Sequence, residues 1–315
     1  MESVHEPVLL HEIVEAFAAP RSELGAKSYE KDSYLIPHTS SVTYLDGTLG
    51  GAGHALAIAK AFQGKLTVIG LDRDLEAVKR AEKSLQGKAD KVILENQDYR
   101  TLDEVLKKHD IPGVDLILLD LGISSDELDN SGRGFTFQKD EPLFMTMGDP
   151  AKYPFTAQTI VNEWEEEVIA DVIFGYGEER FARRIAKAII AYRGKKKIET
   201  TGELAEIISS SVPGFYKRGK IHPATRTFQA IRIAVNDELN ALKEGLDKGY
   251  AALTTGGRMA IISFHSLEDR IVKDFYKKKA LYGSKILTKK PIVASDQERV
   301  ENPRSRSAKL RILEK

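Results

Sequence analysis

Apolar runs of strand length alternate with helical patterns in the first half of the chain, and this alternation limits the possible folds most. The runs cover residues 42–46, 66–72, 91–94 and 114–120, and helical patterns follow the first two at 55–62 and 75–85. Strands that are joined through helices pair in parallel. Parallel strands are covered on both faces and are therefore apolar along most of their length, as the fourth run is. The first half predicts a doubly wound, mostly parallel, Rossmann-like sheet.

The pattern changes after Gly134. Amphipathic helical segments follow one another from residue 156 to about residue 212 with no strand between them, whereas helix and strand patterns return beyond Pro223. The later part predicts one helix over 227–246, a strand at 258–264, a helix at 267–279 and two terminal strands at 285–293 and 307–315. We therefore expect the α/β fold class, with a core from residues 1–134 and 223–315 and an inserted all-helical domain at 135–222.

The chain has no cysteine among its 315 residues. This excludes disulfide scaffolds, thiolate zinc sites, iron–sulfur clusters and cysteine nucleophiles, and it favours a reducing compartment. No apolar run approaches the roughly 20 residues that span a bilayer, and the first residues mix charges into a helical period, unlike a signal peptide. We expect a cytoplasmic protein with no membrane partner and no metal site.

Charge is balanced overall and segregated along the chain. The sequence has 47 basic and 47 acidic residues, yet segment 180–232 carries a net charge of +10, segment 270–315 carries +9 and segment 150–179 carries −6. Basic surfaces of this kind bind polyanions such as nucleic acids. Solvated helix faces with local ion pairs would give the same counts, so the charges alone leave both interpretations open.

The densest motif is the run 46–54, DGTLGGAGH, which lies between the first predicted strand and its helix. Glycine lets a backbone approach a ligand closely, and the following helix offers unpaired N–H groups. Gly51 and Gly53 could begin the dinucleotide pattern G-x-G-x-x-G, but its third glycine would fall on Leu56. Asp46, directly before the glycines, suits a ligand with a cationic amine and no pyrophosphate, such as S-adenosylmethionine. A plain tight turn is the structural alternative.

Polar side chains also follow the other predicted strands. Asp72 ends the second strand, where a carboxylate would bind ribose hydroxyls. Asp98 and Tyr99 follow the third, where a polar or flat side chain would meet an adenine ring, although Tyr99 would equally serve packing. Asp120 ends the fourth strand. Because ligands bind beyond the carboxyl ends of parallel strands, we expect these carboxylates to face one crevice.

The motifs together resemble a known family. DGTLGGAGH, LLDLGISS, RGFTF, HPATRTFQAIRIAVNDEL and SFHSLEDRIVK stand in the order of the RsmH (MraW) family of S-adenosylmethionine-dependent methyltransferases, from His5 to the C-terminus. The resemblance implies a class I methyltransferase fold whose helical insertion recognises the substrate. It also implies methylation of the exocyclic N4 amine of a cytidine in the decoding region of small-subunit ribosomal RNA. The implied partner is that RNA or the assembling small subunit, and self-association into homo-oligomers stays undetermined.

The resemblance assigns cofactor contacts position by position. With Asp46 and Gly51 from the motif itself, the candidate cofactor-binding residues are Asp46, Gly51, Ala52, Gly53, His54, Asp72, Tyr99, Asp120 and Glu127. The chain departs from the family in five places, of which Tyr99, where the family often has Phe, is a mild one. Glu127 stands where the family commonly has Gln, Phe144 and Thr146 replace an Asp and an Arg, and residues 21–41 form a longer connection whose role the sequence does not reveal.

Methyl transfer to nitrogen requires the protein to position two atoms and to tune a poor nucleophile. A hydrogen-bond acceptor beside the cytosine amine would stabilise its developing positive charge. Asp120 is the first candidate for this catalytic role and His265 the second, although a structural role for a buried histidine is equally compatible. Phe135 and Phe137 are candidates for holding a flipped base, with a small local core as the alternative.

Two other functions share some of these features. An NAD(P)-dependent oxidoreductase would have the same sheet, but the chain lacks the third glycine and an evident hydride-transfer pair. A non-catalytic, cofactor-binding factor for ribosome assembly would use the same basic surfaces. The sequence leaves that second alternative open.

Overall fold

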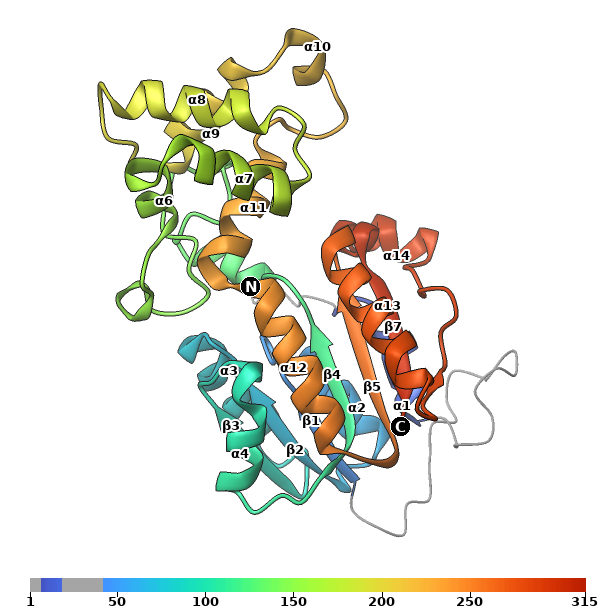
Figure 1. The fold of residues 1–315 in the computed structure, drawn as a ribbon. Helices are drawn as coiled ribbons and strands as arrows, with labels where there is room; N and C mark the ends of the chain where they lie inside the picture. Colours follow the sequence, from blue (N-terminus) through green and yellow to red (C-terminus); the bar gives the residue numbers. More distant parts are fainter. Residues whose placement is uncertain (1–6, 19–41) are drawn as a thin grey trace. The chain divides into compact units, whose positions relative to one another are not determined.

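The computed structural model describes residues 7–18 and 42–315, so the predicted long connection at 21–41 lies outside the described residues. The chain divides into two compact units, one formed by residues up to Gly122 and from Asn240 onward, the other by Ile123–Leu239 (Figure 1). The predicted boundaries lay after residues 134 and 222 instead. They differ because Ile123 and Phe228, outside the predicted insertion, pack in the core of the second unit.

The first unit is built on a seven-stranded sheet of order β3-β2-β1-β4-β5-β7-β6. Its strands are β1 (Val42–Asp46), β2 (Leu66–Leu71), β3 (Lys91–Glu95), β4 (Val114–Asp120), β5 (Leu253–Ser263), β6 (Lys285–Ile286) and β7 (Lys309–Glu314). The first five pair in parallel, and β7 runs antiparallel to both of its neighbours. This confirms the predicted doubly wound, mostly parallel sheet. Because β2 and β4 flank β1, the carboxyl end of β1 is the topological switch point, where ligands bind in such sheets.

Helices cover both faces of this sheet (Figure 1). They are α1 (Leu10–Ala18), α2 (Gly53–Ala61), α3 (Leu75–Leu85), η1 (Tyr99–Thr101), α4 (Leu102–Lys108), α12 (Glu238–Ala252), α13 (Ser266–Ala280), α14 (Asp296–Glu301) and η3 (Pro303–Ser307). Alternate residues of β4 serve the two faces, since Leu116 and Leu118 pack with α1 and α2, while Ile117 and Leu119 pack with α4, α12 and α13.

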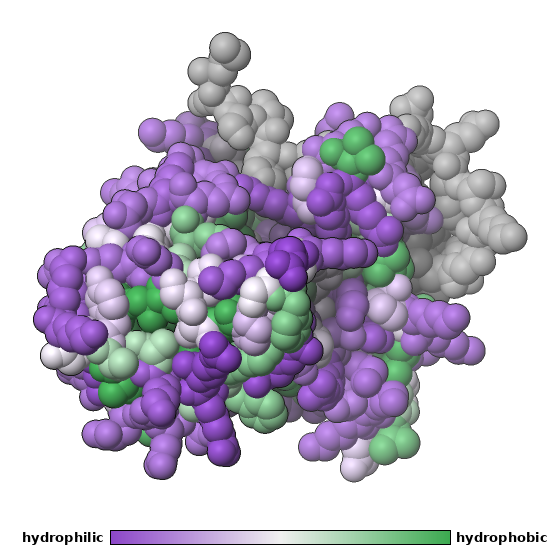
Figure 2. Space-filling view, turned by 90° about the horizontal axis from the view of Figure 1, so that it is seen from above, coloured by the Kyte–Doolittle hydropathy of each residue, from purple (hydrophilic) through white to green (hydrophobic). Residues whose placement is uncertain are grey.

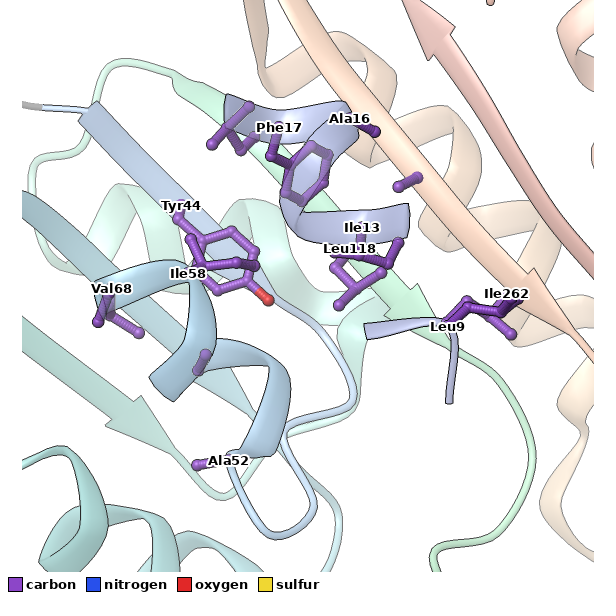
Figure 3. Close-up of a cluster of buried hydrophobic side chains, with 14 of the residues drawn as sticks. Leu9, Ile13, Ala16, Phe17, Tyr44, Ala52, Ile58, Val68, Leu118 and Ile262 are labelled. Atoms are coloured by element: carbon purple, nitrogen blue, oxygen red, sulfur yellow. The ribbon is translucent and has the colours of Figure 1, made fainter. Parts of the chain in front are cut away.

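The core on the α1 side gathers side chains from distant parts of the chain. Phe17 of α1 contacts the ring of Tyr44 of β1 edge to face, with ring centres 6.1 Å apart. Ile58 of α2, Leu118 of β4 and Ile262 of β5 belong to the same buried cluster (Figure 3). This packing fixes β1, β4 and β5 side by side, and with them the residues that follow each strand.

The second unit is helical. It contains α5 (Ser125–Asn130), η2 (Pro150–Lys152), α6 (Ala157–Glu163), α7 (Glu166–Gly177), α8 (Ala182–Arg193), α9 (Thr201–Ser211), α10 (Gly214–Lys217) and α11 (Thr225–Asn236). The sequence predicted one helix over 227–246, and this was wrong. The structure ends α11 at Asn236, and Asp237 adopts a left-handed backbone with φ of 49° before α12 begins. Asn236 then uses its buried amide to hold the backbone at Met145 and Met147.

Among the described residues, no helix is long and apolar enough to cross a membrane. On the face shown in Figure 2, small hydrophobic patches lie within a larger hydrophilic surface. Isolated exposed apolar side chains are ordinary on protein surfaces, so only those with a distinctive setting call for a functional explanation.

Candidate functional site

The loop between β1 and α2 needs glycine at its first position. A Cβ atom on Gly47 would lie 2.3 Å from Leu119 Cδ2 and 2.9 Å from Tyr99 Cβ, which is too close for any side chain. Further along, Ala52 adopts a left-handed backbone with φ of 62° directly before α2. Gly51 is exposed, and a Cβ atom added there would meet no atom of the described residues within 4 Å beyond its chain neighbours. The loop is therefore tightly packed on the sheet at its start and open at Gly51.

Asp46 lies buried at the end of β1. One carboxylate oxygen accepts a hydrogen bond of 2.8 Å from the Tyr44 hydroxyl, and the other accepts one of 3.1 Å from the Thr48 N–H. Burial outweighs these hydrogen bonds and raises the pKa of Asp46 from 3.8 to about 6. Asp46 therefore holds the start of the loop, and burial makes ionisation of its carboxyl group unfavourable.

Asp72 follows β2 and ties this loop to the neighbouring strand. Its two carboxylate oxygens accept hydrogen bonds from the N–H groups of Gly50, at 2.7 Å, and of Asp74, at 2.8 Å. Burial raises the pKa of Asp72 despite these bonds. Each carboxylate oxygen has a second lone pair, so Asp72 can also accept hydrogen bonds from ligand hydroxyls.

Asp120 ends β4 and carries a buried oxygen without a hydrogen-bond partner among the described residues. Its side chain is 24% exposed, and the buried oxygen is Oδ1. Its backbone N–H donates 2.7 Å to Thr48 Oγ1. Burial, followed by the negative charges of Asp46 and Glu268, raises the pKa of Asp120 well above its ordinary value. A cationic donor at this position would satisfy both the oxygen and the charge.

His54, at the start of α2, lies beside Asp120. Its Nε2 contacts the Val8 carbonyl oxygen at 2.9 Å, which assigns the ring proton to Nε2. Burial lowers the pKa of His54 to about 4, so the ring is neutral at neutral pH. Nδ1 then presents a lone pair 3.8 Å from Asp120 Oδ2. Two acceptors facing each other attract a donor placed between them.

His265 is the residue before α13 and has a structural role in the described chain. Its ring and the Glu268 backbone form one half of a capping box, and the Glu268 carboxylate accepts a 2.9 Å hydrogen bond from the Phe264 N–H. The distance from His265 Nε2 to Glu268 Oε1 is 3.2 Å. No hydrogen bond or ion pair joins His265 to Asp120 among the described residues.

Tyr99 packs its ring against α12. A Cβ atom on Gly245 would lie 2.5 Å from Tyr99 Cδ2, so this helix needs glycine to accept the ring. Asp98, beside it, forms an ion pair with Arg73 and accepts a 3.0 Å hydrogen bond from the Arg100 N–H. Tyr99 therefore lies near the loop at Gly47, and its ring has the packing role that the sequence left open; its contact with an adenine ring stays a prediction.

Glu127 belongs to the second unit, whereas the other candidate cofactor residues belong to the first. It forms a capping box with Ser124 at the start of α5, and Arg133 lies 3.4 Å from its carboxylate. These contacts all lie within the helical unit. The described structure gives Glu127 a local structural role, and its cofactor contact stays a prediction.

The two aromatic candidates for base contact also lie in the second unit. Phe135 is only 8% exposed and belongs to the buried helical core, which supports the alternative of a small local core. Phe137 packs against Phe228 and His222, with ring centres 5.0 and 4.6 Å away. Thr146, where the family has Arg, is buried and donates to the Gly148 carbonyl oxygen. These residues stabilise a local fold.

Sequence reasoning missed three residues that organise the site. Tyr44 and Thr48 position Asp46 and Asp120, and Glu268 both caps α13 and raises the pKa of Asp120. Glu268 left a readable signal, because a glutamate three residues after a capping position is the capping-box pattern. Tyr44 left none, since an aromatic residue in a strand is ordinary.

Comparisons with known proteins agree with the motifs. A family model described as the MraW methylase family matches residues 2–315. A protein of Heliobacterium modesticaldum named ribosomal RNA small subunit methyltransferase H is 44% identical, over 99% of this chain and 98% of that relative. A protein of the same name from Acetivibrio thermocellus is 45% identical over 100% of both chains.

A solved structure from Streptococcus mutans in complex with SAH has a TM-score of 0.42 and 11% identity, over 87% of this chain and 89% of that one. The family match and the two relatives span nearly the whole chain, and they confirm the resemblance that the motifs indicated. The chain therefore belongs to the MraW methylase family and is a methyltransferase that depends on S-adenosylmethionine.

Proposed function

We propose that this methyltransferase acts on small-subunit ribosomal RNA, at the exocyclic N4 amine of a cytidine in the decoding region. Two relatives that match nearly the whole chain are named for small-subunit ribosomal RNA. The cytidine and its N4 amine follow from the motif resemblance. The cytoplasm, where ribosomal subunits assemble, is the corresponding place of action.

The three carboxylates at the sheet edge fit a positively charged methyl donor. Asp46, Asp72 and Asp120 follow the adjacent strands β1, β2 and β4, and burial raises the pKa of each. A bound cation stabilises the ionised forms of all three carboxylates. When bound, S-adenosylmethionine supplies a methyl group that its sulfonium makes electrophilic.

The buried, unpartnered Oδ1 of Asp120 is the observation that carries the proposed mechanism. The cytosine amine is a poor nucleophile because its lone pair is delocalised into the ring. A carboxylate beside it would stabilise the positive charge that develops on nitrogen as the N–C bond forms, and would then accept the proton; the methyl–sulfur bond would break in the same displacement and leave a neutral thioether. Thr48 holds the backbone of Asp120, and His54 faces its other oxygen. Asp120 is thus held at the end of β4 with one oxygen available.

The helical unit is proposed to contact the RNA. Its exposed cations include Lys195 and Lys197, whereas Arg193 donates to the Val161 and Trp164 carbonyl oxygens and Lys196 pairs with Glu203. Phosphate contacts set the register of a protein on RNA without reading its sequence. Comparing methylation of free ribosomal RNA with that of small subunits would identify which form is the substrate.

The test compares the parent with Asp120→Asn in single-turnover methylation at saturating S-adenosylmethionine and RNA. Asparagine keeps the shape and one acceptor oxygen but lacks the negative charge. We expect a rate roughly 100-fold to 1,000-fold lower, a barrier increase of about 2.7–4 kcal/mol. The matched control is Asp115→Asn on the same strand, since the hydrogen bonds that Asp115 accepts within residues 7–18 and 42–315 come from the Thr43 N–H and the Thr254 hydroxyl. Its rate in folded protein should stay near that of the parent.

Mass spectrometry of the nucleosides identifies the product. Absence of N4-methylcytidine from RNA treated with the parent would contradict the proposed substrate, and cofactor and RNA binding without any methyl transfer would indicate an assembly factor. If Asp120→Asn keeps its rate within about threefold of the parent at saturation, about 0.7 kcal/mol in barrier, Asp120 only holds the cofactor. His265 would then be the next acceptor to test.

A further inference from the structure

The helical unit carries one exposed aromatic ring among unpaired cations. Phe215, in α10, is 60% exposed. Lys217, Arg218 and Lys220 follow it within five residues and are all exposed. None of these three cations forms an ion pair within the part of the chain that the structure describes. The proposed function so far makes no use of this group.

Arg180 fixes the ring of Phe215 from within the unit. Its guanidinium carbon lies 4.9 Å from the ring centre of Phe181, 5.0 Å from that of Tyr216 and 5.6 Å from that of Phe215. Phe181 also contacts Phe215 edge to face, with ring centres 6.4 Å apart. These cation–π and aromatic contacts orient Phe215 while leaving more than half of its surface open.

A buried carboxylate anchors the same cluster. Glu179 is fully buried, and its oxygens accept a 2.8 Å hydrogen bond from the Phe181 N–H and a hydrogen bond from the Tyr216 hydroxyl. Because Phe181 directly precedes α8 and Tyr216 lies in α10, this carboxylate holds the two helices together. The ring of Phe215 is therefore presented on a rigid support.

A second exposed phenylalanine in the same unit has the opposite surroundings. Phe174 of α7 is 66% exposed, slightly more than Phe215. Its exposed neighbours one helical turn away are Asp171 and Glu178, and both are acidic. A polyanion would be repelled there. Phe174 and Phe215 are similarly exposed but have neighbours of opposite charge. A comparison of the two therefore isolates the effect of the surrounding charge.

We propose that Phe215 is a stacking platform for an unpaired base of the RNA substrate, with Lys217, Arg218 and Lys220 contacting the flanking phosphates. This inference rests on the proposed function and names a binding site for it. Aromatic faces accept any base, while nearby cations attract the backbone. An exposed ring on a rigid support pays little ordering entropy on binding. The occupant is therefore single-stranded RNA, held with little sequence preference.

The probe is a short, labelled single-stranded oligouridine, whose affinity is measured by fluorescence anisotropy at several salt concentrations. Phe215→Ala should weaken binding by roughly 5-fold to 150-fold, the effect of about 1–3 kcal/mol per stacked base. Its salt dependence should stay that of the parent, because no charge is removed. Phe215→Leu, which keeps apolar area without a ring, should also lose affinity, and Phe215→Trp should retain it. The matched control Phe174→Ala should bind as the parent does.

The cations give the complementary result. Replacing Lys217 and Arg218 with Gln should lower the slope of log affinity against log salt by about 0.7 for each phosphate that the variant no longer neutralises. Unchanged affinity in Phe215→Ala, full affinity in Phe215→Leu, or equal decreases in Phe215→Ala and Phe174→Ala would overturn the platform. A change in sedimentation of the Phe215→Ala protein without a change in RNA affinity would also overturn the platform, since the ring would then contact a second copy of the chain.

Methyl transfer by the parent to ribosomal RNA is measured alongside. If the parent transfers no methyl group but the oligouridine results hold, the proposed function fails and the platform stands. If the parent methylates ribosomal RNA and Phe215→Ala binds oligouridine normally, only the platform fails.

Discussion

Asp46 shows how one side chain combines structural and functional demands. Its two oxygens accept hydrogen bonds from Tyr44 and Thr48, yet burial still raises its pKa to about 6. At neutral pH the folded chain therefore keeps a carboxylate where ionisation is costly. Perturbed groups of this kind cluster at functional sites, and a cationic ligand would relieve the cost.

Replacing Asp46 with Asn should make this cost measurable through its pH dependence. The pKa is 3.8 for an unperturbed aspartate and about 6 in the folded chain, so the folded state holds the proton more tightly. Ionisation of Asp46 then removes stability as pH rises through this interval, and the loss is complete above pH 6. The free energy of unfolding of Asp46→Asn relative to the parent should rise by about 2–3 kcal/mol between about pH 4 and about pH 7.5.

Chemical denaturation of the ligand-free protein at each pH measures this difference. Asp171→Asn, at an exposed position on α7, controls for the change in net charge. A difference that is the same at both pH values would show that Asp46 ionises in the folded chain as easily as in the unfolded one.

Residues at strand ends were the predictable part of the site. Asp46, Asp72 and Asp120 each end an apolar run, and the sheet brings them to one edge as expected. Tyr44 was not predictable as a site residue, because an aromatic residue in a strand is ordinary. The capping-box pattern of Glu268 marks the start of a helix rather than a site. The side chain of Tyr44 reaches Asp46 from within the same strand, two residues away, so its role depends on both side chains pointing to one face.

At the scale of elements, the loop between β1 and α2 depends on the end of β2. The Gly50 N–H donates to Asp72, and the Leu49 N–H donates to the Leu71 carbonyl oxygen. Asp72 therefore holds the loop that the glycines allow to approach a ligand. Its proposed bond to ribose hydroxyls would add to this role.

Asp72→Ala should lower the affinity for S-adenosylmethionine by roughly 10-fold to 150-fold, the effect of losing a charge-assisted hydrogen bond of about 1.5–3 kcal/mol. Isothermal titration calorimetry on folded protein measures it. Asp74→Ala is the control, because Asp74 caps α3 through the Glu76 N–H and is not a candidate for ligand binding. Equal affinities for the parent and Asp72→Ala would remove Asp72 from the cofactor site.

No feature of the sequence indicated the break between α11 and α12. Apolar residues keep a helical period through residues 227–246, and neither glycine nor proline marks position 237. The left-handed backbone of Asp237 ends α11 there, and the preceding Asn236 is engaged with the backbone of a loop 91 residues earlier in the chain. A break set by such a distant contact leaves no local signal.

At the scale of the whole molecule, the segregation of charge was predictable from the sequence. Which cations form ion pairs within the fold and which stay exposed was not. Segment 180–232 carries a net charge of +10, and part of this charge serves the fold. Arg193 binds backbone carbonyl oxygens, Lys196 pairs with Glu203, and Arg232 pairs with Glu238. Counting charges along the sequence overestimates the cations available to a polyanion, because ion pairs form only once the helices are in place.

The exposed lysines that remain should determine the salt dependence of RNA binding. Cations that contact phosphates release condensed counterions, so affinity falls as salt concentration rises. Lys195 and Lys197 are exposed in the connection that follows α8, whereas Lys196 already has a partner in Glu203. Replacing Lys195 and Lys197 with Gln should lower the slope of log affinity against log salt by about 1.4–1.8, from roughly 0.7–0.9 for each neutralised phosphate. Lys196→Gln should have a smaller effect.

The measurement is affinity for small-subunit ribosomal RNA over a series of salt concentrations, with S-adenosylmethionine affinity determined in parallel and expected to be unchanged. Lys65 and Lys91, both exposed and located at the amino ends of β2 and β3, provide a control pair of equal charge in the other unit. They lie at the sheet edge opposite the carboxylates, so replacing both with Gln should leave the slope as it is in the parent. Equal slopes for the parent and the Lys195 and Lys197 variant would mean that these lysines are solvated and contact no phosphate, and the cations near Phe215 would then carry the phosphate contacts.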